Sequence, residues 1–307
     1  MTPYYQPSHK MPPGGIGLLL AGGVVAAAVL AVVYIYAVWY IPFVYINFVL
    51  CLGFGLLLGA VLAQLVRLGK LRSPRAVGAL AIGLGLVAVY LEWAVYLTLL
   101  LNSETTGVGD SADTTTSFSF TVFAGLLASP GLLLDAMRQL NATGSWSLKG
   151  ATPSGVFLAL IWLVEAVVIV GGAYLLAHSQ ATEPFSEVSN EWADEETLAH
   201  PVGYAHDLAT TRSALETGQF QHLVPYADQP GEDRFARLQL HCAPNDPACH
   251  YLTLHNISRT LDKKGKPTEA TTTVIKHLAI SQATYQDLKS RFGQPPAPAL
   301  AAGSASA

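Results

Sequence analysis

The sequence predicts a membrane protein with four transmembrane helices, followed by a small cytosolic α+β domain with an antiparallel sheet. Only 12% of the 307 residues are charged, whereas a soluble domain usually has about 25%. Most of these charges lie after residue 178. Four apolar runs are long enough to cross a bilayer, because about 20 helical residues span its hydrocarbon core: residues 16–40, 45–66, 76–101 and 154–178.

The first two apolar runs are expected to form an antiparallel helical hairpin. The first run is too long for a cleaved signal peptide, whose apolar core has about 7–15 residues. Pro42 ends this run, because the residue before a proline is pushed out of the helical region, and the second run begins at once. Aromatic residues around this turn suit a membrane–water interface: Tyr34, Tyr36, Trp39, Tyr40, Phe43, Tyr45 and Phe48.

The loop after the second run predicts the orientation. It contains four basic residues, Arg67, Lys70, Arg72 and Arg75, and short loops rich in Lys and Arg stay on the cytoplasmic side. Counting the runs from this loop places both the N- and the C-terminus in the cytoplasm of a bacterial inner membrane. The net charge of −4 indicates that nucleic acid is not a partner, since such proteins carry a clustered basic face.

Two features of the runs and loops predict local packing. Gly55 and Gly59 form a small-xxx-small pair in the second run, which lets helix backbones approach closely in lipid. The outer loop, residues 102–153, begins with a solvated segment and contains a helix at 130–140, because Ser129 and Pro130 provide an N-cap followed by a proline. We expect this helix to lie on the outer surface against lipid or neighbouring helices.

The remaining segments are assigned from composition and alternation. We expect an extended arm at 1–15, which is rich in proline, an acidic linker with a loose helix at 179–199, and a disordered tail at 293–307. The soluble domain, residues 200–292, should contain a helix at 206–219 and a final helix capped by Ser281. Between them we expect three strands of an antiparallel meander: residues 234–242, 249–258 and 271–280.

Four potential metal ligands flank the loop between the first two predicted strands: His241, Cys242, Cys249 and His250. Neighbouring residues on a strand point to opposite faces, so His241 and Cys242 cannot easily converge on a zinc ion. A disulfide between the cysteines fits a hairpin, but the expected cytoplasmic side is reducing. The sequence favours free thiols or a weak redox pair over zinc or a stable disulfide, and it leaves these alternatives open.

Two carboxylates lie inside the apolar runs, Glu92 in the third and Glu165 in the fourth. Measured from the cytoplasmic ends, they lie about 24 Å and about 20 Å along their helices, hence at similar depth. If the two helices are adjacent, the carboxylates share one low-dielectric site in which both cannot comfortably ionise. Acidic residues at membrane depth often mark function. A structural pair that satisfies polar groups between helices is the alternative.

We expect the chain to be a scaffold or subunit of a membrane assembly, whose cytosolic domain docks a protein partner or a second copy. The alternative function is a small oligomeric transporter coupled to protons or cations, which uses Glu92 and Glu165. An enzyme is disfavoured, because the sequence has no glycine-rich phosphate loop, nucleophile elbow or HExxH zinc helix. We expect no cofactor and no bound metal.

Overall fold

The computed structural model describes residues 3–41, 43–106, 113–144, 152–226, 233–261 and 266–293. The chain divides into two compact units, of which one is Ser8–Thr182 and the other combines Met1–Pro7 with Glu183–Ala307. Pro42 and nearly all of the expected tail lie outside the described residues. Each unit is described separately below.

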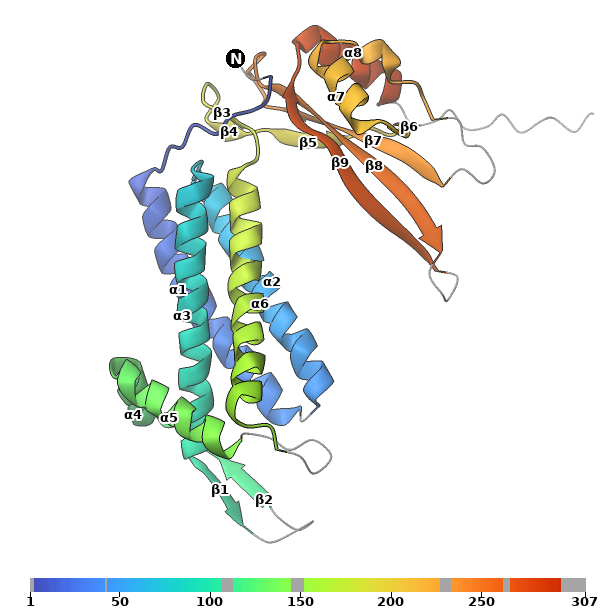
Figure 1. Ribbon diagram of the computed structural model, residues 1–307. Helices are drawn as coiled ribbons and strands as arrows, with labels where there is room; N and C mark the ends of the chain where they lie inside the picture. The colour runs from blue at the N-terminus through green and yellow to red at the C-terminus, as the bar shows by residue number, and fades with distance from the viewer. Residues whose placement is uncertain are drawn as a thin grey trace, which may run out of the picture. The chain divides into compact units, whose positions relative to one another are not determined.

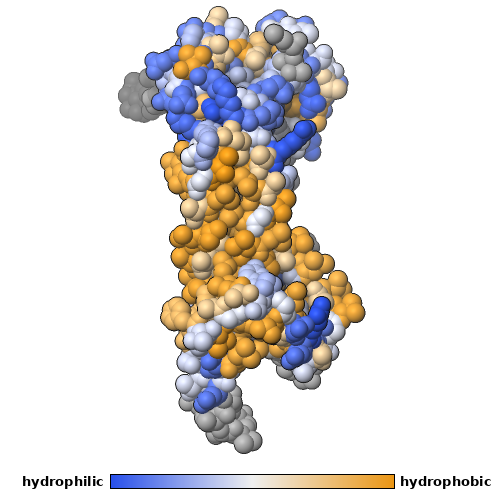
Figure 2. Space-filling view, turned by 90° about the vertical axis from the view of Figure 1, so that its left-hand side faces the viewer, coloured by the Kyte–Doolittle hydropathy of each residue, from blue (hydrophilic) through white to orange (hydrophobic). Residues whose placement is uncertain are grey.

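Four long helices form the first unit: α1 (Pro13–Tyr40), α2 (Val44–Leu68), α3 (Pro74–Leu101) and α6 (Gly155–Ala181). Each coincides with one of the apolar runs and is long and apolar enough to cross a membrane. On the face seen in Figure 2, hydrophobic residues form a broad band along this unit. Val25, Leu57 and Val167 are examples, with more than half of each side chain exposed. An apolar surface of this extent fits lipid rather than water. The four helices that the sequence predicts are therefore present, and they are consistent with the predicted membrane class.

The four helices pack as a bundle in which α1 and α6 each lie against both α2 and α3 (Figure 1). Helices α2 and α6 cross at glycines. A Cβ atom added at Gly59 would lie 2.3 Å from the carbonyl oxygen of Gly172, and one added at Gly55 would lie 2.7 Å from that of Val168. The small-xxx-small pair therefore forms a backbone-to-backbone contact between α2 and α6.

Helix α1 begins at Pro13, three residues before the apolar run, so the expected arm at 1–15 is too long. A proline is tolerated in the first turn of a helix, where its missing N–H needs no partner. Residues 3–5 are paired as well. The backbone N–H of Tyr5 donates to the carbonyl of His277 at 2.9 Å, and Ala279 N–H donates to Pro3 at 2.7 Å. The start of the chain thus extends the edge of the sheet in the second unit.

Between α3 and α6 the chain forms a short hairpin and two helices. The hairpin consists of β1 (Ser103–Thr106) and β2 (Asp113–Thr116), and it is followed by α4 (Phe120–Ala128) and α5 (Pro130–Thr143). Helix α5 confirms the helix expected at 130–140. Helix α4 was not expected, and the two meet at a bend of 104°, because Pro130 starts a new helix rather than continuing the first.

The second unit is built on one antiparallel sheet with the order β5-β7-β8-β9, in which β6 also pairs with β7. The antiparallel sheet expected in the C-terminal region is confirmed. Its strands are β5 (Asp194–Thr197), β6 (Val202–Gly203), β7 (Arg234–Cys242), β8 (His250–Leu261) and β9 (Pro267–Ala279).

Two helices and a 3-10 turn complete the second unit: α7 (Leu208–Glu216), α8 (Gln282–Phe292) and Phe220–His222. As expected, Ser281 caps α8, and its hydroxyl accepts a hydrogen bond from Thr284 N–H at 3.1 Å. Tyr285, Leu288 and Phe292 of α8 are buried against one face of the sheet, which contributes alternate residues of its strands to the core: Leu238, Leu240, Leu252, Leu254, Ile275 and Leu278.

The segment expected as an acidic linker with a loose helix instead forms strands. A small hairpin, β3 (Phe185–Ser186) with β4 (Glu191–Trp192), precedes β5. The rings of Phe185 and Trp192 are both buried, and their centroids lie 5.1 Å apart. In the sequence, the acidic residues conceal these strands. A strand with one face in water can carry charges at alternate positions, so an acidic segment need not be a linker.

Candidate functional site

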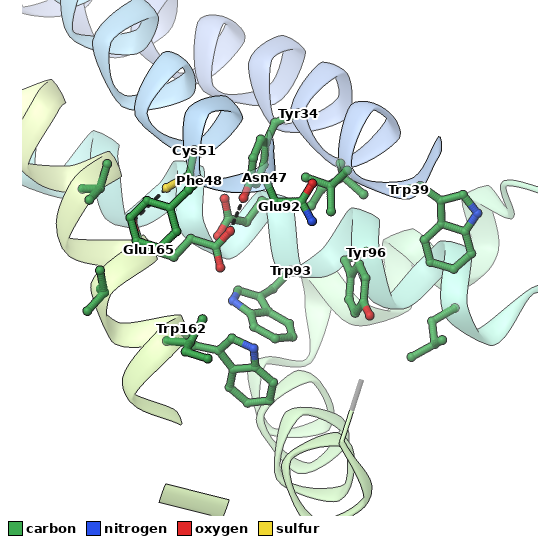
Figure 3. Close-up of a pocket in the computed structure, with 16 residues that line it drawn as sticks. Tyr34, Trp39, Asn47, Phe48, Cys51, Glu92, Trp93, Tyr96, Trp162 and Glu165 are labelled. Atoms are coloured by element: carbon green, nitrogen blue, oxygen red, sulfur yellow. Dashed lines mark hydrogen bonds between the residues drawn. The ribbon is translucent and has the colours of Figure 1, made fainter. Parts of the chain in front are cut away.

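Glu92 and Glu165 meet in the centre of the helical bundle. Glu92 lies nine residues before the end of α3, and Glu165 lies ten residues after the start of α6. These separations correspond to about 14 Å and about 15 Å along the two helices. Because α3 and α6 pack against each other and run in opposite directions, the two carboxyl groups reach the same level and line one cavity (Figure 3).

Each helix of the bundle contributes a polar group to this cavity. The Tyr34 hydroxyl of α1 donates a hydrogen bond to Glu165 across the centre. The Cys51 thiol of α2 lies 3.7 Å from the backbone carbonyl of the same glutamate. Glu92 is only 3% exposed, and within the described residues its Oε2 and the Oδ1 of Asn47 have no hydrogen-bond partner. A buried acceptor without a partner is costly, which points to a ligand or a proton at this position.

Aromatic rings form the wall of the cavity beside the carboxylates, and its volume is about 540 Å³. The rings of Trp93 and Trp162 are in edge-to-face contact with their centroids 4.6 Å apart. Tyr96 lies between Trp93 and Trp39, at 5.8 Å and 5.9 Å from their rings. No lysine, arginine or histidine is among the described residues that line it. The site therefore combines two acids with an aromatic wall, without a basic side chain among the lining residues that the structure describes.

The sequence predicts the two acids of this site but not the residues around them. Tyr34 was assigned to the interfacial aromatic belt, but it is 5% exposed and faces the carboxylates, whereas Tyr40 and Tyr45 are exposed as expected. The available signal was its position: Tyr34 lies six residues before the end of α1, about 9 Å into the helix. A tyrosine at that depth has a hydroxyl that must find a partner inside the bundle.

The four hairpin residues do not form one site. His241 bonds to Thr253 on one face of the sheet, at 3.1 Å. On the other face, Cys242 accepts a hydrogen bond from the Tyr285 hydroxyl of α8 at 3.3 Å, and the ring of His250 packs on Tyr285. His241 and Cys242 thus face opposite ways, as strand alternation requires.

All three cysteines of the chain, Cys51, Cys242 and Cys249, are free thiols in the structure. Cys249 is 3% exposed. Burial raises the pKa of its thiol to about 11, so at neutral pH it is a neutral thiol, which is neither a good nucleophile nor a good metal ligand.

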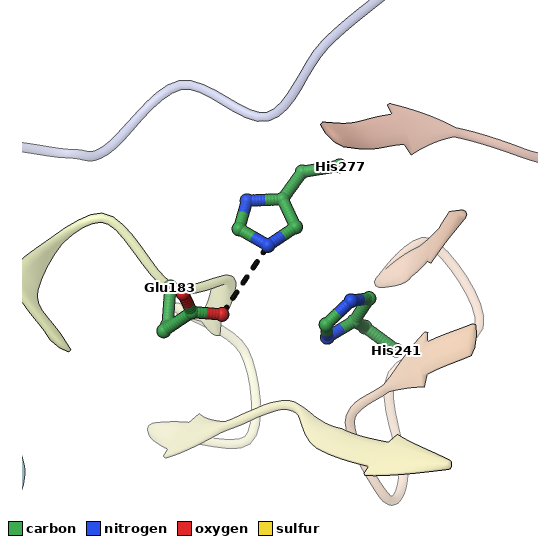
Figure 4. A group of neighbouring side chains, drawn as sticks. All are labelled: Glu183, His241 and His277. Atoms are coloured by element: carbon green, nitrogen blue, oxygen red, sulfur yellow. Dashed lines mark ion pairs between the residues drawn. The ribbon is translucent and has the colours of Figure 1, made fainter. Parts of the chain in front are cut away.

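His241 belongs instead to a cluster with two residues that were not singled out in the sequence, Glu183 and His277 (Figure 4). The potential ligand atoms of these three side chains lie within 4.8 Å of one another. His277 Nε2 lies 3.2 Å from Glu183 Oε2, and Lys276 Nζ lies 3.2 Å from Glu183 Oε1. Because 58 residues separate Glu183 from His241, no local spacing could reveal the group.

The environment fixes the charges in this cluster. Burial, reinforced by the charge of the neighbouring His277, lowers the pKa of His241 to about 4. Burial opposes ionisation of Glu183, but the hydrogen bond and charge of His277 and the charge of Lys276 outweigh it and lower the pKa of Glu183 to about 2. At neutral pH the cluster therefore contains an ionised carboxylate and a neutral His241 imidazole.

The four basic residues that predicted the orientation lie around the turn between α2 and α3. Arg67 is in the last turn of α2 and Arg75 in the first turn of α3. Arg72 is 5% exposed, and its backbone bonds to Lys10 and His9, at 3.0 Å and 3.1 Å. The N-terminal segment of the first unit thus covers part of this loop.

No protein-family model matches this sequence, and no similarity to a curated protein or to a solved structure was found. The functional argument therefore depends on the geometry of the chain itself.

Proposed function

We propose that this chain is an integral membrane protein that binds a cation between its transmembrane helices and exchanges it for protons, acting as a small oligomeric transporter. The observation that supports this function most directly is the convergence of Glu92 and Glu165 in one cavity at the centre of the bundle. Two ionised carboxylates side by side in a low dielectric are unfavourable without a compensating positive charge. No basic side chain supplies this charge among the described lining residues, so a proton or a bound cation must do so.

The volume and the aromatic wall of the cavity favour an organic cation over a bare metal ion. Its volume of about 540 Å³ lies within the range of small-molecule sites. The tryptophan and tyrosine rings on its wall offer cation–π contacts, which are strongest where the cation is desolvated. A proton and a lipophilic cation would compete for the negative charge of the carboxyl pair. This competition is the basis for exchanging one for the other.

A binding experiment on the purified full-length protein tests this proposal. Tetraphenylphosphonium serves as the probe because it is a bulky, delocalised cation. We expect saturable binding accompanied by proton release into a weakly buffered solution. Glu165→Gln keeps the size of the side chain but removes its charge, and should weaken binding at least about tenfold, as should Glu92→Gln. In proteoliposomes, the same variants should abolish exchange driven by a proton gradient.

The matched control is Glu104→Gln, which removes an exposed carboxylate in β1 and should leave binding and proton release unchanged. Thermal melts of each variant establish that it is folded. Wild-type protein that does not bind the probe, or a folded Glu165→Gln variant that binds as tightly as wild type, would contradict the proposal.

We further propose that the protein lies in a bacterial inner membrane with both termini in the cytoplasm, which the basic loop between α2 and α3 supports. A reporter that is active only in the cytoplasm should be active when fused after Gly293 and inactive when inserted near Gly109. Replacing Arg67, Lys70 and Arg75 by glutamine should reduce the difference in reporter activity between the two positions. The opposite pattern of reporter activity would reverse the orientation.

The role as a scaffold that docks a partner through the C-terminal unit stays a prediction. The cavity supports the transport function more specifically, because it assigns a chemical role to residues from all four long helices.

A further inference from the structure

We propose that Glu183, His241 and His277 form a binding site for one divalent transition-metal ion of the Zn²⁺ or Co²⁺ type. These three residues belong to the second unit, and the site is independent of the intramembrane cavity. Two imidazoles and one carboxylate are a ligand set that zinc and its neighbours in the first transition row accept, whereas Mg²⁺ and Ca²⁺ prefer oxygen ligands alone.

The spacing of the ligand atoms is close to what a metal requires. In a tetrahedral zinc site with bonds of about 2.0–2.1 Å, neighbouring ligand atoms lie about 3.4 Å apart. His277 Nε2 and Glu183 Oε2 already lie 3.2 Å apart, and all three ligand atoms lie within 4.8 Å of one another. A small rotation of the side chains completes the set, and the ion takes the place of the hydrogen between His277 and Glu183.

The surrounding residues hold the two histidines in place. Thr253 is the common partner: its hydroxyl oxygen lies 3.1 Å from Nε2 of His241 and accepts the backbone N–H of His277, also at 3.1 Å. Nε2 of His241 is therefore held by a hydroxyl, and we take Nδ1, the other ring nitrogen, as its ligand atom. Histidines that bind metals are usually oriented in this way by a hydrogen bond to the second ring nitrogen.

The backbone at His277 is a second, independent sign of a built site. Leu252 pairs with Leu278 and Leu254 pairs with Ile275. Two residues of β9, Lys276 and His277, therefore lie opposite the single residue Thr253, which defines a β-bulge. His277 has a φ of +52°, in the left-handed region that is unfavourable for a residue with a side chain. Bulges that redirect a side chain in this way are common beside functional sites.

The burial of the cluster is compatible with an ion that enters from solvent. His241 and His277 are 3% and 6% exposed, whereas the side chain of Glu183 is 29% exposed and provides the accessible side. Lys276 opposes a cation, but its side chain is 46% exposed and can turn into water. It contacts Oε1 of Glu183, so Oε2 remains for the ion. Three protein ligands leave one position for water or for a ligand from outside the chain.

The test is a metal titration of the full-length protein, purified with a tag that contains no histidines and treated with EDTA. Co²⁺ is the first probe, because its visible absorption bands report the ligands and the coordination number. Zn²⁺ is then measured by competition with a chromophoric chelator. We expect one ion per chain. Glu183→Gln, which keeps the size of a partly exposed side chain, and His277→Ala should each weaken binding at least about tenfold.

Two controls separate this site from its neighbours. His255→Ala removes a histidine of the same sheet that bonds to Gln239 and Thr273 instead, and it should change the affinity less than about twofold. The double variant Cys242→Ser/Cys249→Ser should also retain the ion. The proposal is overturned if wild-type protein binds no Co²⁺, if folded Glu183→Gln binds it as wild type does, or if the cysteine variant loses it.

Discussion

Replacing Gly59 by leucine should destroy the helical bundle. The added Cβ alone would lie 2.3 Å from the carbonyl oxygen of Gly172, and a backbone oxygen cannot move aside as a flexible side chain can. Overpacking of a core costs about 1–3 kcal/mol where neighbours can adjust, so a larger loss is expected here. Helix association in lipid also depends on van der Waals contacts between closely packed backbones. A leucine at position 59 would push α2 away from α6 and remove these contacts.

In a Cys242→Ser/Cys249→Ser background, which leaves Cys51 as the one thiol of the chain, the reaction of a thiol-specific fluorescent dye with Cys51 during heating measures this loss. Cys51 is 6% exposed and reacts only when the bundle opens. The matched controls are Gly53→Leu in α2 and Gly171→Leu in α6, because no atom lies within 4 Å of a Cβ added at either position. Both controls should melt near the wild-type temperature. A Gly59→Leu variant that also melts there would show that the α2–α6 crossing is not close-packed.

Acid should destabilise the second unit, and His241 should account for the upper part of this effect. Its pKa is lowered from 6.5 to about 4 in the folded chain, so below pH 6.5 the unfolded chain binds a proton that the folded chain excludes. The stabilising contribution is complete above about pH 6.5 and is lost as the pH falls to about 4. A shift of this size corresponds to a loss on the order of 3 kcal/mol. Glu183, whose pKa is lowered to about 2, extends the loss below pH 4.5.

Hydrogen–deuterium exchange of β7 and β8 amides, in EDTA and corrected for intrinsic rates, measures this dependence in the full chain. His241→Gln cannot gain a proton, and its stability should change much less than that of wild type between pH 6.5 and 4. His206 is exposed, so His206→Gln is the matched control and should follow the wild-type curve. Equal pH dependence in the His241→Gln variant would assign the acid sensitivity to other groups.

The sequence alone determined the four long helices and three strands of the C-terminal sheet, β7, β8 and β9. Hydrophobic length located α1, α2, α3 and α6, because a bilayer sets a minimum length for an apolar helix. Alternation of apolar and polar residues predicted a strand at 234–242, and β7 has these same bounds, Arg234–Cys242. The alternation arises because the core on one face requires every second side chain to be apolar. These signals depend only on residues that are near one another in the chain.

The sequence also predicted that Glu92 and Glu165 lie at similar depth, since helix rise converts residue number into distance. It could not show that α3 and α6 are neighbours, or that Tyr34 reaches Glu165 from α1. These facts depend on which helix faces pack together. Here that packing follows from shape, because α6 approaches α2 at the glycines and thereby turns Glu165 toward the centre of the bundle.

Only the tertiary structure decided the composition of the polar sites. Strand alternation already predicts from the sequence that His241 and Cys242 face opposite ways, but it does not reveal which residues lie beside His241. Its actual neighbours, Glu183 and His277, come from the chain after α6 and from a bulge in β9. A bulge is a difference in residue count between two paired strands. It exists only after the strands have paired, so no single segment of the sequence contains it.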